Sequence, residues 1–318
     1  MKKLDQLLQG YETIGITGHI RPDGDCVGSC LALYAYIRKN YPSKKVEVYL
    51  ESFSPVFQIL TGADQVITEA EADVSYDLFF VLDTSDEKRM GSNCKYYELA
   101  KHTVCLDHHI SNKGFCDENM IEPDASSTCQ VLFEQMEEAK IDKAIAEALY
   151  TGIVHDTGMF RHSSTTPRTM EIAGHLMEYG IDFHRIIADT YMKKTYVQNQ
   201  VLGRALLESI MLLDGTCIAS VISQDVMEFY GVDNNDLEGI IDQLKATDGV
   251  ECAIFLYQTG ALEYKVSLRS EETIDVSEIA LHFGGGGHKR AAGCTMQGTK
   301  YDILNNLIEE ILKQKKAE

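Results

Sequence analysis

Two clusters of histidine and aspartate residues in this chain have the composition of metal sites. The first is a short stretch that places His19, Asp23 and Asp25 on what we expect to be one tight loop. The second is the consecutive aspartate–histidine–histidine triplet at 107–109. Imidazole and carboxylate ligands without cysteine suit a hard or borderline divalent ion such as Mn²⁺ or Mg²⁺ better than a structural zinc. Two such clusters in one chain predict a two-metal hydrolytic site.

Hydrolysis of a phosphodiester needs a nucleophilic hydroxide and neutralisation of the phosphoryl oxygens. Two metal ions about 3.5–4 Å apart supply both when a carboxylate bridges them. Taken singly, the acids have ordinary explanations, because Asp23-Gly24 is a turn signal and Asp83 or Asp156 can cap a helix. The metal prediction rests on the acids occurring together. Each one follows a predicted strand or helix, and all are expected at the same edge of the sheet. The candidate ligands are His19, Asp23, Asp25, Asp83, His108 and Asp156, with His109 left for the substrate or for supporting the ligands.

The charge balance limits the class of substrate. The chain has 49 acidic and 29 basic residues, which gives a net charge of −20. A protein that grips long duplex nucleic acid usually presents a basic face, because phosphate neutralisation supplies most of its affinity. The composition therefore excludes a long duplex partner and favours a small anionic substrate that metals and a few arginines neutralise locally.

Cysteine usage and hydropathy indicate the compartment. The nine cysteines are scattered and include no CxxC pair, which is typical of free thiols in a reducing cytoplasm. No apolar run approaches the length that spans a membrane. We therefore expect a cytoplasmic protein without a membrane partner.

The elements that position the candidate ligands can be read from the apolar runs. Runs at 13–17, 77–82 and 103–106 read as buried strands, and helical patterns such as 27–40 and 126–139 lie between them. This alternation predicts a doubly wound α/β domain with a mainly parallel sheet. In such sheets ligands bind beyond the carboxyl ends of the strands, where these motifs fall. A further helical pattern at 142–154 delivers Asp156.

The second half of the chain changes character. Residues 183–210 read as one or two connecting helices. Strand-like runs at 216–222, 252–257 and 264–269, with helices at 236–246 and 301–313, then indicate a smaller mixed α/β domain. The predicted division is an N-terminal catalytic domain at 1–185, a helical connector at 186–212 and a substrate-binding domain at 213–318.

The motifs, in this order, resemble those of the DHH phosphoesterase superfamily. The resemblance rests on His-x-x-Pro-Asp-x-Asp-x-x-Gly-Ser from His19, a strand-end aspartate, Asp-His-His, and a later Asp-Thr-Gly. Gly-Gly-Gly-His-x-x-Ala-Ala-Gly at 285–293 resembles the DHH-associated C-terminal domain. Within the superfamily, the chain is similar to the NrnA-type oligoribonuclease and pAp phosphatase group. It also resembles phosphodiesterases that act on cyclic-di-AMP or on its linear product pApA.

The resemblance implies a division of the ligands between two manganese ions. One ion would be held by His19, Asp23 and Asp83. The other would be held by Asp25, Asp83, His108 and Asp156, so that Asp83 bridges the pair. His109 would contact the nucleophile or a phosphate oxygen, which makes His109 and Asp83 the expected catalytic residues. The sequence departs from the family pattern at His155, where threonine often stands, and at the extra Gly284.

A second group of residues is expected to bind the substrate. Glycine allows backbone N–H groups to approach a phosphate closely, although a glycine run is equally compatible with a linker or a hairpin. The resemblance favours phosphate binding and adds a Ser-x-Arg strand. Asn112 and Arg161 are candidates for lining the cleft, with a solvated surface position as the alternative for each. The expected substrate-binding residues are Ser267, Arg269, Gly285, Gly286, Gly287, His288, Asn112 and Arg161.

Together these observations predict a Mn²⁺-dependent two-metal phosphoesterase, with Mg²⁺ or Co²⁺ as substitute ions. It would hydrolyse oligoribonucleotides of two to five nucleotides and pAp, releasing mononucleotides. The alternative within the same class is a cyclic-di-AMP or pApA phosphodiesterase. A non-enzymatic nucleotide sensor would be expected to have lost a metal ligand, and none is missing. A homodimer is expected only by analogy with the family.

Overall fold

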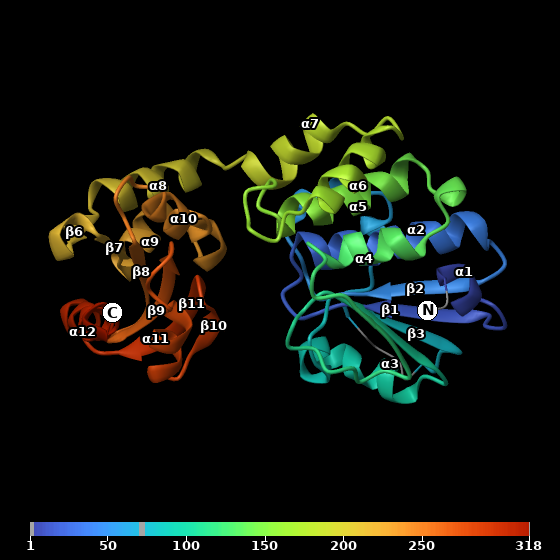
Figure 1. Cartoon of the computed structure of the whole chain (residues 1–318), viewed down its shortest axis with the longest axis horizontal. Coiled ribbons are helices and arrows are strands. Elements are labelled where there is room, and N and C mark those ends of the chain that lie inside the picture. Colours follow the sequence, from blue (N-terminus) through green and yellow to red (C-terminus); the bar gives the residue numbers. More distant parts are fainter. Residues whose placement is uncertain (1–2, 70–73, 318) are drawn as a thin grey trace. The chain divides into compact units, whose positions relative to one another are not determined.

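The structure is a computed structural model that describes residues 3–69 and 74–317. Its chain separates into two compact units, Met1–Lys193 and Lys194–Glu318. The division falls inside the stretch expected to be a helical connector. Each unit has its own sheet and its own hydrophobic core (Figure 1).

The N-terminal unit is built on a parallel sheet. Within the described residues this sheet has five strands in the order β2-β1-β3-β4-β5, and every neighbouring pair is parallel. The strands are β1 (Thr13–Thr17), β2 (Lys45–Tyr49), β3 (Leu78–Leu82), β4 (Thr103–Asp107) and β5 (Glu118–Ile121). The three predicted strands are β1, β3 and β4, which occupy the centre of the sheet.

Helices cover both faces of this sheet, as the doubly wound prediction requires. Helices α2 and α4 lie over one face, with α5 in the same core, and α3 lies over the other face (Figure 1). The α-helices are α1 (Leu4–Leu7), α2 (Gly24–Asn40), α3 (Cys94–Leu99), α4 (Thr128–Gln135), α5 (Lys143–Asp156), α6 (Pro167–Met177) and α7 (Phe183–Ile186). Short 3-10 segments are η1 (Pro55–Ile59), η2 (Ala63–Gln65), η3 (Glu87–Asn93) and η4 (Glu138–Lys140), and η5 (Ile187–Met192) is a π-helix.

The C-terminal unit is built on a mixed sheet, which confirms the expected second α/β domain. In the described part of the chain its six strands have the order β10-β11-β9-β8-β7-β6, and only the β7–β8 pair is parallel. The strands are β6 (Ile210–Leu212), β7 (Cys217–Ile222), β8 (Cys252–Gly260), β9 (Glu263–Ser270), β10 (Gly286–His288) and β11 (Ala291–Gln297).

Two apolar clusters lie on the two faces of this mixed sheet. One cluster joins the sheet to α11 and α12, and the other joins it to α8 and α10 (Figure 1). The helices of this unit are α8 (Tyr196–Leu207), α9 (Gln224–Tyr230), α10 (Ile240–Lys245), α11 (Val276–His282) and α12 (Lys300–Ala317), with 3-10 segments η6 (Leu213–Gly215) and η7 (Asn234–Leu237).

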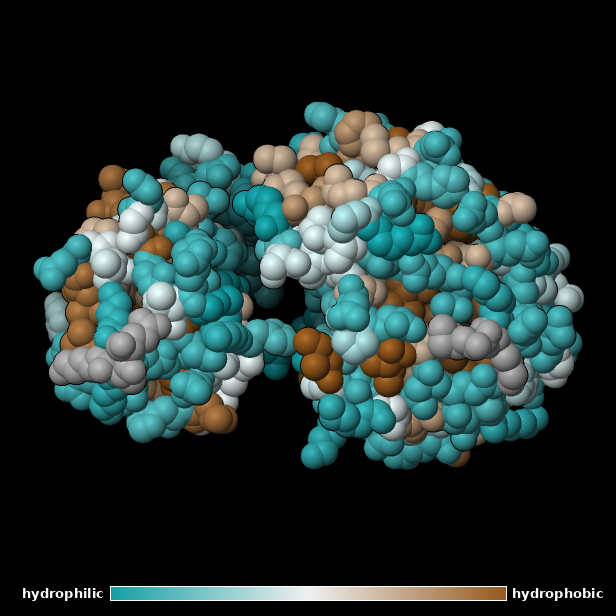
Figure 2. All heavy atoms as spheres, in the orientation of Figure 1, coloured by the Kyte–Doolittle hydropathy of each residue, from teal (hydrophilic) through white to brown (hydrophobic). Residues whose placement is uncertain are grey.

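The surface is largely hydrophilic on the face drawn in Figure 2. Large apolar side chains are nevertheless exposed, among them Ile110, Tyr196, Leu207 and Phe229. Among the described helices, none combines the length and the apolar character needed to cross a bilayer.

Candidate metal centre

The carboxyl ends of three central strands bring the predicted ligands to one edge of the parallel sheet. His19 follows β1 by two residues, Asp83 follows β3 directly, and the Asp-His-His triplet begins at the last residue of β4. Asp25 lies in the first turn of α2, which Asp23 caps, and Asp156 is the last residue of α5. Strands β1, β3 and β4 are parallel neighbours, so their ends meet at the same rim.

Asp83 lies at the middle of this group. One carboxylate oxygen, Oδ2, is 3.4 Å from Nε2 of His19, and the other, Oδ1, is 3.7 Å from Nε2 of His108. Nδ1 of His109 is also 3.7 Å from Oδ1. The Asp83 side chain is buried and its backbone has a φ of +53°, a conformation that residues other than glycine rarely adopt. A strained backbone therefore holds this carboxylate between two sets of imidazoles.

The remaining predicted ligands complete two sides of the cluster. On one side, Nε2 of His19 is 3.6 Å from Oδ2 of Asp23, whose side chain is 59% exposed at the mouth of the centre. On the other side, Nε2 of His108 is 3.1 Å from Oδ2 of Asp156, and Asp25 lies in the same group. The structure thus brings all six predicted ligands together, while their division between two ions remains a prediction.

One thiol that the sequence did not suggest as a ligand also reaches the cluster. The Cys26 sulfur lies with a ring nitrogen of His19 and a carboxylate oxygen of Asp83 in a group whose atoms are all within 4.8 Å of one another. Burial is the main reason that the pKa of this thiol lies well above its usual range. A neutral thiol is a poor metal ligand, so the carboxylates and imidazoles carry the donor set.

The pKa shifts and the charges of the cluster favour the binding of cations. Burial and the neighbouring carboxylates raise the pKa of Asp25 and of Asp156 well above the ordinary value. Burial acts to lower the pKa of His19, but the carboxylates of Asp23 and Asp83 raise it to about 12. Across residues 3–69 and 74–317, no lysine or arginine forms an ion pair with any of the four candidate acids, which are Asp23, Asp25, Asp83 and Asp156. Oxygen and imidazole donors without an ion-paired lysine or arginine fit divalent cations of the Mn²⁺ or Mg²⁺ type.

The ring orientation of His19 fits ligation through Nε2. Its Nδ1 is 2.8 Å from the carbonyl oxygen of Ile20. A carbonyl can only accept a hydrogen bond, so Nδ1 carries a proton and Nε2 is the nitrogen that faces the cluster, where a cation could replace its proton. This arrangement, with one nitrogen held by a backbone group, is the usual way of orienting a metal-binding histidine.

Asp107 positions the two histidines that follow it by hydrogen bonding, a role that sequence analysis missed. The buried carboxylate accepts hydrogen bonds from Nδ1 of His109 at 2.7 Å and from the backbone N–H of His108 at 2.9 Å. Its other oxygen accepts from Nδ2 of Asn112 at 2.7 Å. Burial acts to raise the pKa of Asp107, but these contacts lower it overall. The available signal was an acid that directly follows the apolar run 104–106, since a buried charge requires hydrogen-bond partners.

The N-terminus of α4 is built against two of the acids. Asp25 accepts backbone N–H bonds from Thr128 at 2.6 Å and from Cys129 at 3.0 Å. The Thr128 hydroxyl donates to Oδ1 of Asp83 at 3.1 Å. The positive end of a helix stabilises nearby carboxylates, so α4 partly offsets their repulsion. Sequence analysis did not identify Thr128, which it could see only as part of a helix start.

Two glycines allow the acid-bearing helices to approach each other. A Cβ on Gly24 would lie 2.2 Å from the ring of His155, and a Cβ on Gly152 would lie 2.6 Å from Oδ1 of Asp25. The unusual His155 therefore packs against the loop that carries Asp23 and Asp25. Its Nε2 is 2.9 Å from the hydroxyl of Thr190, and burial lowers its pKa to about 4, so the ring is neutral at pH 7.

The two cleft candidates in this unit differ in their surroundings. Asn112 is buried, and besides Asp107 it donates to the carbonyl oxygen of Thr84 at 3.0 Å. Arg161 is exposed, and its Nε donates to the carbonyl oxygen of Gly158 at 2.8 Å. A substrate contact by either residue stays a prediction, and for Asn112 the amide is already bound to protein groups.

The expected phosphate-binding residues of the C-terminal unit share neighbouring strands. Gly286–His288 forms β10, which pairs with β11, and β11 pairs with β9. Through β11, Ser267 aligns with Gly286, and Arg269 aligns with His288. The Nε of Arg269 contacts Oδ1 of Asp242 at 3.1 Å. The structure thus gathers these residues on one part of the sheet, and their contact with substrate remains a prediction.

The glycine run is partly explained by this hairpin itself. A Cβ on Gly285 would lie 2.2 Å from the carbonyl oxygen of Gly293, and one on Gly287 would lie 2.5 Å from that of Ala291. Both glycines are therefore required for close approach to β11. Gly286 has no heavy atom within 4 Å of its ideal Cβ position among the described residues, so packing does not explain it.

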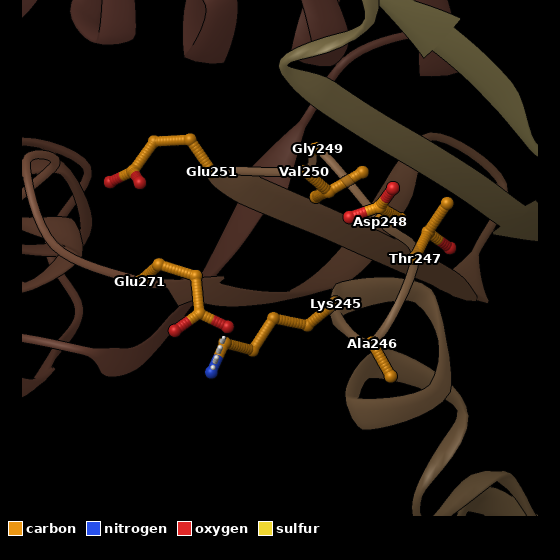
Figure 3. A pocket seen from close by; sticks show the side chains of 8 residues that line it. All are labelled: Lys245, Ala246, Thr247, Asp248, Gly249, Val250, Glu251 and Glu271. Carbon is orange, nitrogen blue, oxygen red and sulfur yellow. Dashed lines mark ion pairs between the residues drawn. The ribbon is translucent and has the colours of Figure 1, made fainter.

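A surface pocket of about 430 Å³ lies elsewhere in the C-terminal unit (Figure 3). Its lysine, Lys245, points toward Glu271, and the two form an ion pair of 2.8 Å. None of the predicted site residues lines this pocket. The lining residues are Lys245, Ala246, Thr247, Asp248, Gly249, Val250, Glu251 and Glu271.

The parallel sheet with its acid and imidazole centre, followed by a mixed-sheet unit, defines a class of two-unit α/β metalloproteins. Comparison with known families is more specific. The DHH family, N-terminal domain, matches residues 13–153, and the DHHA1 domain matches residues 215–314. The two matches together cover well over half of the chain. The chain therefore contains a DHH-family N-terminal domain followed by a DHHA1 domain.

Similar proteins extend over nearly the whole chain. A Streptococcus mutans protein named as a probable bifunctional oligoribonuclease and PAP phosphatase NrnA is 28% identical, over 95% of this chain and 97% of its own length. The Bacillus subtilis protein named bifunctional oligoribonuclease and PAP phosphatase NrnA is 26% identical, over 90% of each chain. A crystal structure of an exopolyphosphatase-related protein from Bacteroides fragilis has the same fold, with a TM-score of 0.88 and 24% identity, covering 98% of this chain and 94% of that one.

Proposed function

We propose that this protein is a two-metal phosphoesterase that hydrolyses very short oligoribonucleotides and pAp, with Mn²⁺ as its natural ion. The observation that carries the proposal is the position of Asp83, whose two oxygens face His19 on one side and His108 on the other. Relatives of matching length are named as bifunctional oligoribonucleases and PAP phosphatases, which supports the substrate class. The net charge of −20 supports small substrates over long nucleic acid.

The proposed ligand sets are those that the family resemblance implies, and the distances around Asp83 support them. His19, Asp23 and Asp83 would hold one cation, and Asp25, Asp83, His108 and Asp156 would hold the other. When bound, the two cations would neutralise the phosphoryl oxygens and activate a water molecule for attack. The side chains come from the ends of β1, β3 and β4, the start of α2 and the end of α5, so several elements of the fold fix their positions.

His109 is the residue best placed to act on the reacting phosphate. Its Nδ1 is held by Asp107, which leaves Nε2 to meet the nucleophile or a phosphoryl oxygen. Burial acts to lower the pKa of His109, but the hydrogen bond and charge of Asp107 raise it overall. A ring that is readily protonated can donate to an anionic oxygen, and we assign that role to His109.

The cellular setting is also a proposal. All nine cysteines are unpaired in the structure, which supports a reducing compartment such as the cytoplasm.

A substrate panel tests the proposed function. With Mn²⁺ present, we expect hydrolysis of pAp and of two- to five-nucleotide RNA, and the relative rates on pApA, cyclic-di-AMP and pyrophosphate will define the preference. Asp83→Ala should lower every rate by at least about 10³-fold, because it leaves the two cation positions without their shared carboxylate. Asp225→Ala, which removes an exposed acid in α9, is the matched control and should behave as the unaltered protein. Near-normal rates in the Asp83 variant would contradict the two-metal assignment.

A further inference from the structure

Arg89 is tied through its backbone to the loop that carries His19. Arg89 lies in η3, a few residues beyond the end of β3 that carries Asp83. Its backbone carbonyl accepts a hydrogen bond of 2.6 Å from the N–H of Ile20, directly after His19. The segment that carries Arg89 is thus tied to the loop that carries the first candidate ligand.

The charge of Arg89 is also felt at His109. Its positive charge works to lower the pKa of His109, against the raising effects of Asp107 and Asp83. The guanidinium is therefore within electrostatic reach of the residue that we place beside the reacting phosphate.

The side chain of Arg89 has no hydrogen-bond or ion-pair partner among the residues that the structure describes. Its Nε is buried and makes no hydrogen bond, and no carboxylate pairs with the guanidinium. Arg168, Arg185, Arg204 and Arg269 each pair with a carboxylate, and no other described arginine has a buried side-chain nitrogen that lacks a hydrogen-bond partner. A buried donor without a partner costs about 1–3 kcal/mol. In a chain with 49 acidic residues, an unpaired arginine beside a cluster of acids requires an explanation.

We propose that Arg89 binds a non-bridging phosphoryl oxygen of the substrate at the metal centre. This inference rests on the proposed function. A guanidinium presents its N–H groups in a planar fork that matches two phosphate oxygens, and burial strengthens such charge-assisted hydrogen bonds. The substrate phosphate then provides the anionic partner that the Arg89 guanidinium lacks in the folded protein. Lysine would keep the charge but lose the fork.

Three variants separate this role from a structural one. Arg89→Met keeps much of the apolar stem, Arg89→Lys keeps the charge, and Lys88→Met removes an exposed neighbouring charge as the matched control. Calorimetry would measure the affinity of the Mn²⁺-loaded protein for inorganic phosphate, and separately the affinity of each variant for Mn²⁺. Steady-state kinetics on pAp would accompany both measurements.

We expect Arg89→Met to weaken phosphate binding and to lower kcat/KM by about 10- to 100-fold, which is the effect of losing a charge-assisted hydrogen bond. Its Mn²⁺ affinity should be unchanged or higher, because a positive charge has been removed beside the cations. Arg89→Lys should recover part of the loss, and Lys88→Met should match the unaltered protein.

Phosphate affinity of Arg89→Met equal to that of the unaltered protein would overturn the inference, as would a parallel loss of Mn²⁺ binding, which would indicate a structural role. The proposed function can fail separately. If the unaltered protein hydrolyses no ester while its phosphate binding still requires Arg89, the anion site stands and the assigned reaction is wrong.

Discussion

Residues behind the candidate ligands hold the centre in shape. Asp107 fixes the ring of His109, and Asn112 in turn fixes Asp107 while binding the carbonyl oxygen of Thr84. Thr84 follows Asp83, so one buried amide links the Asp-His-His triplet to the central carboxylate. Partners of this kind typically change metal affinity or activity by 10- to 100-fold when they are removed.

Asn112→Ala tests this positioning role. We expect kcat to fall by about 10- to 100-fold while KM changes by less than about 3-fold, because the amide is bound to Asp107 and to the carbonyl oxygen of Thr84. Ser111→Ala, which alters the exposed neighbour, should leave both constants unchanged. Steady-state kinetics on pAp measures both constants. A large rise in KM with kcat unchanged would instead make Asn112 a direct substrate contact, as the sequence suggested.

Sequence analysis could predict that the candidate ligands converge, but not which residues support them. His19, Asp83 and His108 follow apolar runs, and the carboxyl ends of parallel strands must meet at one edge, so their convergence was predictable. The roles of Asp107, Asn112 and Arg89 were not, because each depends on which side chain lies opposite in space. A buried amide and a solvated amide look identical in a sequence.

At the scale of elements, the centre depends on how closely α2, α4 and α5 approach. Gly152 in α5 faces Cys129 of α4 and Asp25 of α2, and its ideal Cβ would lie 2.2 Å from the Cys129 sulfur. Gly174 in α6 has the opposite setting, since it is exposed and its Cβ would meet no described atom within 4 Å. The two helical glycines therefore form a natural pair for comparison.

Gly152→Ala should destabilise the N-terminal unit by about 1–3 kcal/mol, because overpacking forces α4 or the Asp25 carboxylate to move. Gly174→Ala should instead stabilise it by about 0.5–1 kcal/mol, because alanine loses less backbone entropy in a helix. Denaturant unfolding gives both free energies, and activity should fall only in Gly152→Ala. Equal stability of the two variants would show that the helices can separate freely.

The central strands were predictable and the edges of the sheets were not. Strands β1, β3 and β4 are almost wholly buried, and therefore read as apolar runs. Edge strand β2 alternates charged and apolar residues, and β5 buries only Met120. The strand within the glycine run has no side-chain signal, because its conformation is set by pairing with β11.

At the scale of the whole molecule, the two units have separate cores. The candidate metal centre lies wholly in the first unit, so cation binding can stabilise that unit directly. A ligand that binds only the folded state stabilises it by about 2.7 kcal/mol when its concentration is about 100 times Kd.

Removal of Mn²⁺ by a chelator should therefore destabilise the N-terminal unit by about 2.7 kcal/mol per site relative to protein kept at about 100 times Kd. Hydrogen exchange of peptides from β3 and from β8 reports on the two cores separately. Protection should fall in β3 and remain constant in β8, and Asp83→Ala should abolish the difference. A fall of equal size in both strands would mean that the units unfold as one.

Asp23 and Asp25 serve the fold as well as the candidate chemistry. Oδ1 of Asp23 caps α2 through the N–H groups of Asp25 and Cys26, and the Asp25 carboxylate accepts two N–H groups of α4. Within the described residues, the Asp156 carboxylate accepts no backbone hydrogen bond. In a lineage that lost the reaction, selection for folding would still retain the first two aspartates. Asp156 is the position at which such a loss would first be recorded.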